Sequence, residues 1–218
     1  MRCGLLLCLT VGLPAADLEV DDVRANGGIL AARVSTESQS TVTPVGGSPG
    51  TPTTNSEVDR MFSLREGVEG FYGDLGPHGG LLWGLGFSVS HYYFSSYAGD
   101  VRIVNPCADV FVGYGYAFRS WLHVEAAPFV GGGWSLYSAT PDGGAFASDN
   151  SRYFEYGLHL GLYATFAESW QAGLEIPTYL GHARMKYYTY DAAGDETVTT
   201  QRNIFRASGV QFSFGIHF

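Results

Sequence analysis

Large apolar and small side chains alternate along most of the chain after Gly79. Within residues 81–93 the odd positions carry mainly large apolar side chains, and the even positions carry mostly small ones. A period of two places successive side chains on opposite faces of a β-strand. The same alternation returns in residues 108–118, 122–134, 154–166, 170–176 and 210–218. The pattern predicts a succession of antiparallel strands through this part of the chain.

The face opposite the large residues differs from that of a soluble sheet. A soluble antiparallel sheet buries one apolar face and presents Lys, Glu, Thr and Arg to water on the other. Here the second face carries mostly Gly, Ser and Ala, with isolated polar groups. Small side chains fit the interior of a narrow barrel, and strands of about 9–11 residues match a tilted crossing of a bilayer. The large apolar residues are therefore expected to face lipid.

The connections alternate between short and long. Very short turns follow Phe118 and Phe166, whereas longer polar segments lie at about 96–106, 138–152 and 183–203. Outer-membrane barrels alternate short periplasmic turns with longer extracellular loops. The connections therefore support a barrel independently of the strand pattern.

The same order, extended toward the N-terminus, predicts two further strands. A turn over Asp74–His78 follows a strand over Met61–Gly73, and a flexible, Ser/Thr/Pro/Gly-rich extracellular loop covers residues 37–58. A first strand is expected at Gly28–Ser35. The residues expected to face outward on these two strands are Leu30, Ala32, Val34, Phe62, Leu64, Val68 and Tyr72. Glu66 would then face lipid and indicates a bulge.

The resulting fold class is an all-β, antiparallel, up-and-down transmembrane β-barrel of eight strands. An even strand number leaves both termini on the periplasmic side. Residues 1–16, with Arg2, an apolar run and then Ala15 and Ala16, predict a secretory signal peptide. Residues 17–27 would form a short periplasmic segment before a barrel over residues 28–218. Cys107 would remain as a lone thiol, which excludes an intramolecular disulfide framework.

Composition agrees with a barrel and excludes other classes. The 218 residues include 30 Gly, 15% aromatic and 15% charged residues, against usual values of about 7% Gly and 25% charged. Mean hydropathy is +0.02, and no apolar span of about 20 residues follows the N-terminus. The net charge of −9, without a basic run, argues against nucleic acid as a partner.

The C-terminal run ends the chain on an aromatic residue. Its outward positions are Val210, Phe212, Phe214, Ile216 and Phe218. This run resembles the terminal β-signal by which the outer-membrane assembly machinery recognises bacterial barrel proteins. Together with the leader, the whole pattern resembles the small OmpA/OmpX-type barrel family. The resemblance implies a bacterial outer-membrane location with periplasmic termini and extracellular loops, and contact with outer-membrane lipid and the barrel-assembly machinery. We also expect a monomer.

Polar residues on the small-residue face are predicted to form a network in the lumen. Its members are Arg65, Glu69, His123, Glu125, Glu155, His159, Gln171, Glu175 and Gln211. Pairing outward from the two short turns sets His159 opposite Glu175, and sets His123 and Glu125 opposite Gly115 and Gly113. Two interpretations compete. The network is a self-satisfied plug, because buried charge must be paired, or it is a gate or catalytic cluster, because a His–Glu pair can transfer protons. The narrow lumen of eight strands favours the plug.

Sequence motifs give catalysis little support. No G-x-S-x-G, H-E-x-x-H or phosphate-loop pattern occurs, and the six His are scattered without metal-ligand spacing. The His-x-Ser-Asn arrangement of lipid A deacylases is absent at His91. We therefore expect no enzymatic activity, no catalytic or metal-binding residue and no cofactor.

The leading hypothesis is a structural or surface-interaction role, acting through loops such as the Tyr-rich segment MKYYTYDAAGDET. The alternatives are a small passive, porin-like channel, a lipid-modifying outer-membrane enzyme and a soluble lipocalin-like binder.

Deleting Phe218 should impair assembly more than stability, because the terminal aromatic residue is read by the assembly machinery. The fraction of protein recovered in the outer membrane should fall, while the refolded variant keeps nearly its full unfolding free energy in detergent. Phe166→Ala, at another aromatic residue beside a short turn, is the control and should leave assembly intact. Equal assembly of the two variants would contradict the prediction.

Overall fold

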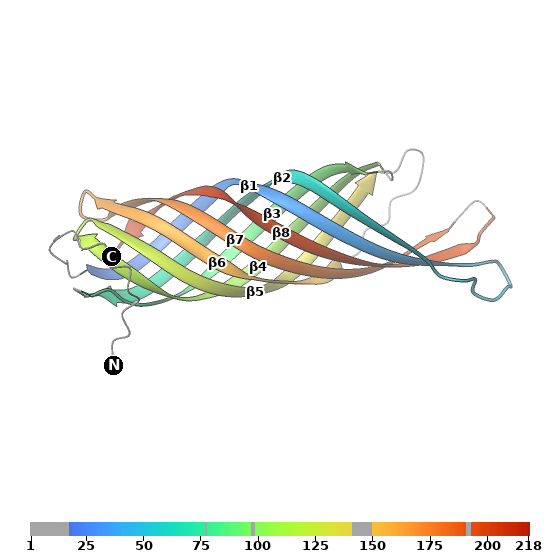
Figure 1. The fold of residues 1–218 in the computed structure, drawn as a ribbon, viewed down its shortest axis with the longest axis horizontal. Coiled ribbons are helices and arrows are strands. Elements are labelled where there is room, and N and C mark those ends of the chain that lie inside the picture. The colour runs from blue at the N-terminus through green and yellow to red at the C-terminus, as the bar shows by residue number, and fades with distance from the viewer. Residues whose placement is uncertain (1–17, 77, 97–98, 141–149, 191–192) are drawn as a thin grey trace.

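The computed structural model describes residues 18–218 except 77, 97–98, 141–149 and 191–192. Eight antiparallel strands form a closed barrel in which each strand pairs with the next and β1 pairs with β8 (Figure 1). The strands are β1 (Leu18–Thr43), β2 (Thr53–Leu75), β3 (Gly80–Ser96), β4 (Gly99–Arg119), β5 (Leu122–Thr140), β6 (Asn150–Phe166), β7 (Trp170–Tyr190) and β8 (Glu196–His217). The predicted fold class is confirmed. In the described residues, no helix is long and apolar enough to cross a membrane.

The outer surface of the barrel carries a broad apolar belt. Leu81, Phe62 and Phe212 expose 75%, 76% and 69% of their surface, and most outward positions of the neighbouring strands are also apolar. A contiguous apolar surface of this size would not be stable in water, whereas lipid tails solvate it. The predicted outward positions of the second strand are confirmed at Phe62, Leu64, Val68 and Tyr72. The chain is therefore an outer-membrane type of β-barrel.

The first strand differs from its prediction in both extent and facing. β1 begins at Leu18, so residues 18–27 pair with β2, and residues 22–27 also with β8, and they are not a separate periplasmic segment. Leu30, Ala32 and Val34 point into the barrel and are almost fully buried, whereas Ile29 is 62% exposed. The run from Ile29 to Ala32 is apolar on both faces, so alternation alone could not assign its sides. The register decides the facing, because Ile29 lies opposite the outward Leu64.

The predicted loop at 37–58 is mostly strand. β1 continues to Thr43 and β2 begins at Thr53, which leaves only residues 44–52 as a connection. Ser and Thr support the extension because β-branched Thr fits a pleated surface and hydroxyl groups bond across strands. The Ser40 hydroxyl lies 2.9 Å from that of Thr199. The three other segments expected as long loops are likewise shortened, and all eight strands, at 17–26 residues, exceed the predicted 9–11.

Two predicted registers are shifted by two residues. Phe166 pairs with Trp170, so the turn between β6 and β7 has three residues, with positive φ at Ala167 and Glu168. Gly161 therefore lies opposite Glu175, and His159 lies opposite Pro177. A register irregularity between Ala117 and Arg119 shifts β4 against β5 in the same sense, so Gly115 lies opposite Glu125 and Ala117 opposite His123.

No bulge occurs at Glu66. Its register with Val89 is continuous with the neighbouring pairs, and the exposed carboxylate lies 3.4 Å from Nε2 of His91 on the outer surface. The predicted bulge is therefore wrong. The outward side chains of Glu66 and His91 contact each other instead.

Candidate functional site: a layered polar network in the lumen

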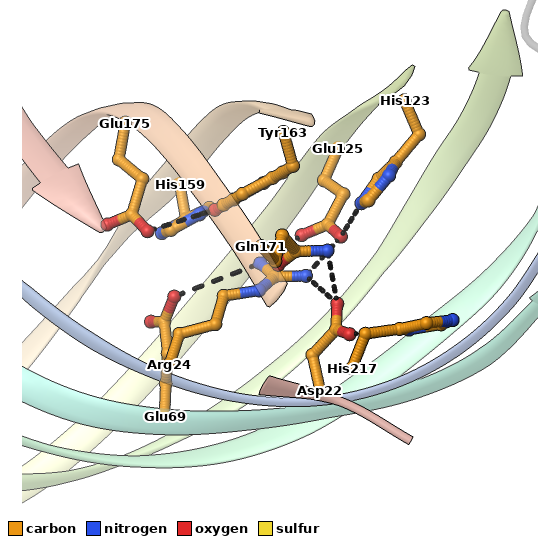
Figure 2. A network of polar contacts seen from close by, with 10 residues as sticks. All are labelled: Asp22, Arg24, Glu69, His123, Glu125, His159, Tyr163, Gln171, Glu175 and His217. Atoms are coloured by element: carbon orange, nitrogen blue, oxygen red, sulfur yellow. Dashed lines mark hydrogen bonds and ion pairs between the residues drawn. The ribbon is translucent and has the colours of Figure 1, made fainter. Parts of the chain in front are cut away.

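The lumen contains two buried arginines, each at the centre of a polar layer. Arg24 on β1 and Arg65 on β2 both point inward and are at most 5% exposed. Carboxylates of β5 and β6 meet them from the far wall, and Figure 2 shows the layer around Arg24. Because water is largely excluded here, each guanidinium group must find its partners within the protein.

Arg24 forms a bidentate ion pair across the barrel. Its Nη1 and Nη2 atoms donate to the two carboxylate oxygens of Glu125 at 2.8 and 2.6 Å, and Nη2 also donates to Asp22 at 2.7 Å. The guanidinium carbon lies 3.7 Å from the ring centroid of Tyr163 and 4.8 Å from that of Phe71. Bidentate geometry with a stacked ring is the arrangement for which guanidinium is better suited than ammonium.

The two carboxylates beside Arg24 have further partners. His123 Nε2 lies 2.9 Å from Glu125, Gln171 donates to Asp22 at 2.8 Å, and His217 Nδ1 lies 2.9 Å from Asp22. These contacts join β1, β5, β7 and β8 in one layer near the C-terminal end of the barrel (Figure 2).

A second part of this layer surrounds Tyr163. Its hydroxyl lies 2.6 Å from His159 Nε2 and donates to Glu175 at 3.1 Å (Figure 2). Glu69 approaches Arg24 only at 4.0 Å. Within the described residues, one oxygen each of Glu69 and Glu175 is buried without a hydrogen-bond partner. In the same described part of the chain, Arg24 Nε, His123 Nδ1 and Gln171 Oε1 are also buried without a partner, so neither part of the layer is fully satisfied.

Arg65 repeats the arrangement further along the barrel. It contacts both oxygens of Glu155 at 3.2 and 2.6 Å and one oxygen of Asp109 at 3.3 Å, and it lies 4.6 Å from the Tyr179 ring centroid. Tyr153 donates to Glu155 at 2.6 Å. The layer is completed by Ser88, Ser90, Tyr92 and Gln211.

Aromatic rings separate the two charged layers. Phe111 lies 5.1 Å from Phe71 and 5.4 Å from Phe129 between ring centroids, and His159 packs 5.8 Å from Phe71. A cavity at this level, beside Arg65, has a volume of about 20 Å³, which is room for about one water molecule. The described side chains therefore close the lumen here.

Glycines make room for the ring of Tyr163. A Cβ atom at Gly161 or Gly173 would lie 2.2 Å from atoms of the Tyr163 ring. Both positions therefore require glycine because the Tyr163 ring occupies the space of a side chain, and the narrow barrel adds to this restriction.

Three groups of side chains have the chemistry of metal ligands. They are Asp22–His123–Glu125, Glu69–His159–Glu175 and Cys107–Asp109–Glu155, with ligand atoms within 4.8 Å of one another in each group. Arginine already contacts carboxylates in the first and third groups. In the second, the His159 nitrogen is bound to Tyr163. The observed contacts therefore favour ion pairing and hydrogen bonding over metal ligation.

All nine residues predicted for the lumen network are inward and buried. Glu69, His123, Glu125, His159, Gln171 and Glu175 join the Arg24 layer, whereas Arg65, Glu155 and Gln211 join the other. The direct pairing of His159 with Glu175 is wrong, because Tyr163 lies between them.

Sequence reasoning missed the central members of both layers: Asp22, Arg24, Asp109, Tyr153, Tyr163 and Tyr179. Asp22 and Arg24 alternate with Val23 and Ala25, which is a strand signal in a segment expected to lie outside the barrel. Asp109 stood on the inward side of its strand's alternation.

Comparisons with known proteins identify no family: no protein-family model and no curated protein matches the chain. Similar solved structures include the outer-membrane protease OmpT of Escherichia coli, at 11% identity and a TM-score of 0.34, covering 88% of this chain and 96% of that one. Ail, the attachment invasion locus protein of Yersinia pestis, has 14% identity and a TM-score of 0.25, covering 83% and 98%. The Pseudomonas putida toluene transporter TodX has 9% identity and a TM-score of 0.19, covering 88% and 90%.

One of these comparisons corrects the expectation that the chain is not an enzyme. OmpT is a protease, so a barrel similar to this one hosts an enzyme. At these identities and TM-scores no residue role carries over to this chain.

Replacing Arg24 by Met should destabilise the barrel by about 3–5 kcal/mol, because it leaves Glu125 and Asp22 buried without their cation. The double variant Arg24→Met/Glu125→Gln should recover part of that loss. Urea unfolding in detergent micelles would measure these two variants and Glu125→Gln alone, which together form a double-mutant cycle. The control Arg102→Gln, at an exposed arginine, should stay within about 0.5 kcal/mol of the original chain. Additive effects of the two lumen substitutions would argue against the ion pair.

Proposed function

We propose that the protein is an outer-membrane barrel with a sealed lumen, which contacts a partner at the cell surface through a protruding β-sheet. The observation that carries this proposal is the extension of four neighbouring strands beyond the rest of the barrel. β1 and β2 pair as far as Ser40 and Thr53, and β1 and β8 pair as far as Thr43 and Glu196 (Figure 1).

This protruding sheet, made of the distal parts of β2, β1, β8 and β7, has an open edge on each side. Among the described residues, the pairing of β2 with β3 begins at Ser63, so Thr53–Phe62 has no neighbour on that side. The pairing of β7 with β6 reaches Ala183, which leaves 184–190 as the other edge. Unpaired backbone groups along a strand edge can accept an added strand from another protein.

The orientation follows from the connections. The ends of the barrel differ, since one has short turns such as Ala167–Ser169 and the other has the protruding sheet. Short turns face the periplasm in outer-membrane barrels. We therefore place the termini in the periplasm and the sheet outside. We further propose that the outward residues Val210, Phe212, Phe214 and Ile216 of β8, with Phe218 directly after the strand, contact lipid and serve as the assembly signal, as the resemblance of the terminal run implies.

A passive channel is the weaker candidate. The two arginine layers and the aromatic rings between them occupy the lumen from several walls, and the cavity beside Arg65 holds about one water molecule. Solute passage would require breaking buried ion pairs, which is costly.

Reconstituted into planar lipid bilayers, the intact protein should therefore show no stable open-channel conductance. Arg65→Met/Glu155→Gln is the informative companion, because it removes the cross-lumen pair of one layer and should raise the frequency of brief openings. A stable, large conductance of the original chain would contradict the sealed lumen.

Shortening the protruding sheet should abolish surface binding without affecting assembly. Gln39 and Thr54 lie opposite each other, so residues 40–53 can be replaced by Asn-Gly, which forms a two-residue hairpin turn. Cells displaying the original or the shortened chain would be tested for binding to arrays of purified extracellular proteins and glycans. A protease site inserted at residues 44–52 would report orientation on intact cells. Equal array binding by both chains, at equal surface levels, would overturn the proposal.

A further inference from the structure

Cationic side chains are concentrated on one part of the outer surface. The chain has 12 Lys and Arg residues. Arg24 and Arg65 lie in the lumen, Arg119 lies at a short turn, and Arg2 lies outside the described residues. The others are all exposed on strand segments toward the protruding sheet: Arg33, Arg60, Arg102, Arg152, Arg184, Lys186, Arg202 and Arg206. In an acidic chain of net charge −9, this segregation calls for a cause.

The strand register sets several of these arginines directly opposite one another. Arg33 on β1 lies opposite Arg60 on β2 and also opposite Arg206 on β8. Arg184 on β7 lies opposite Arg202 on β8. Directly opposed residues have Cβ atoms about 4.5–5.5 Å apart, and like charges in this position destabilise a sheet. An anion held between the guanidinium groups would reverse that cost.

The protein itself supplies little compensation. Within the described part of the chain, none of these five arginines forms an ion pair with a carboxylate, including Arg202, which lies opposite Glu37. By contrast, Arg102 lies beside the Tyr93 ring, 5.5 Å from its centroid, and opposite Ser138. Arg102 likewise has no carboxylate partner among the described residues, so the five opposed arginines differ from it in facing a like charge directly across a strand pair.

A groove accompanies the β7–β8 pair. It has a volume of about 670 Å³, and its lining includes Arg152, His182, Arg184, Thr200, Arg202 and Glu37. Its size is in the range of sites that hold a small organic ligand. Its cationic and hydroxyl-bearing walls suit phosphate, because guanidinium groups bind phosphate oxygens in a bidentate manner.

The level of the arginines along the barrel identifies the source of the phosphate. On β1 the outward positions run from apolar Ile29 to Arg33, and on β2 Phe62 precedes Arg60 toward the protruding sheet. Arg206 lies opposite Leu180. The arginines therefore begin where the apolar belt ends, which is the level of lipid headgroups.

We propose that the opposed arginines Arg33, Arg60 and Arg206, together with Arg184 and Arg202, bind phosphate groups of outer-leaflet lipid headgroups. The site goes beyond the proposed surface contact and shares with it only the orientation of the barrel. If the protease assay showed the sheet on the periplasmic side, the outer-leaflet assignment would fail while phosphate binding in detergent would remain measurable.

The first test measures binding of lipid A, a phosphorylated glycolipid, to the full chain in a neutral detergent by native mass spectrometry. Arg33→Gln/Arg206→Gln should weaken binding by about ten-fold or more, since it removes two charge-assisted contacts. Arg102→Gln/Arg119→Gln removes the same charge from arginines without an opposed partner and should change binding by less than about three-fold. Equal losses in the two double variants would overturn a built site.

The second test uses the sign of a stability change, and it does not depend on an affinity. Without phosphate-bearing lipid, Arg206→Gln should leave unchanged or raise the unfolding temperature, because it relieves repulsion from Arg33. With lipid A present, the same substitution should lower the unfolding temperature relative to the original chain. A change in unfolding temperature of the same sign with and without lipid A would contradict the proposal.

The last comparison distinguishes the sources of phosphate. Chemically dephosphorylated lipid A should lose most of the affinity, which shows that phosphate is recognised. Inorganic phosphate should bind far more weakly than lipid A, because the apolar belt holds only the lipid beside the arginines. Equal affinity for inorganic phosphate would overturn the assignment to a lipid headgroup.

Discussion

The ion pairs between Arg24 and Glu125 and between Arg65 and Glu155 connect opposite walls of the barrel. β1 and β5 are four strands apart in a ring of eight, and so are β2 and β6. Backbone hydrogen bonds join only adjacent strands, so they leave the cross-section of the barrel free to flatten. Two bidentate pairs spanning the lumen restrict that deformation, because each has a fixed length and a fixed plane. The packing of the aromatic rings and the positions of the inward glycines depend on this fixed cross-section.

Charge balance explains why so many neutral donors surround the arginines. Among the described residues, six buried carboxylates face only two buried arginines. The remaining demand is met by groups that donate without carrying a full charge, such as the Tyr153 hydroxyl on Glu155 and the Gln171 amide on Asp22. Tyrosine serves two purposes here, because Tyr163 also stacks on Arg24. A buried carboxylate needs such donors, since its desolvation is expensive.

The sequence predicted the fold where one face was large and the other small. From Leu81 onward, that contrast assigned the middle of each strand and its lumen-facing side, although the strands continue into segments expected as loops. It failed in the first strand, because Ile29, Leu30, Ala31 and Ala32 are apolar or small on both faces, and only pairing with β2 distinguishes the two sides. The register between β6 and β7 was also hidden, because it depends on the backbone conformation of Ala167 and Glu168, which propensity does not specify. The network's members were therefore predictable individually, but their partners were not.

The two environments of arginine show how one residue type stabilises a barrel in different ways. In the lumen, Arg24 is surrounded by carboxylates contributed by the chain, and its charge is satisfied before any ligand binds. On the outer surface, Arg33 has arginines as cross-strand neighbours on both sides. Neutral side chains at these outward positions would leave the packing of the lumen unchanged. The arginines repel one another only while no anion is bound between them. Once the headgroup region supplies the counter-charge, the same arrangement anchors the barrel at a defined depth, and the lumen network keeps the wall that carries it rigid.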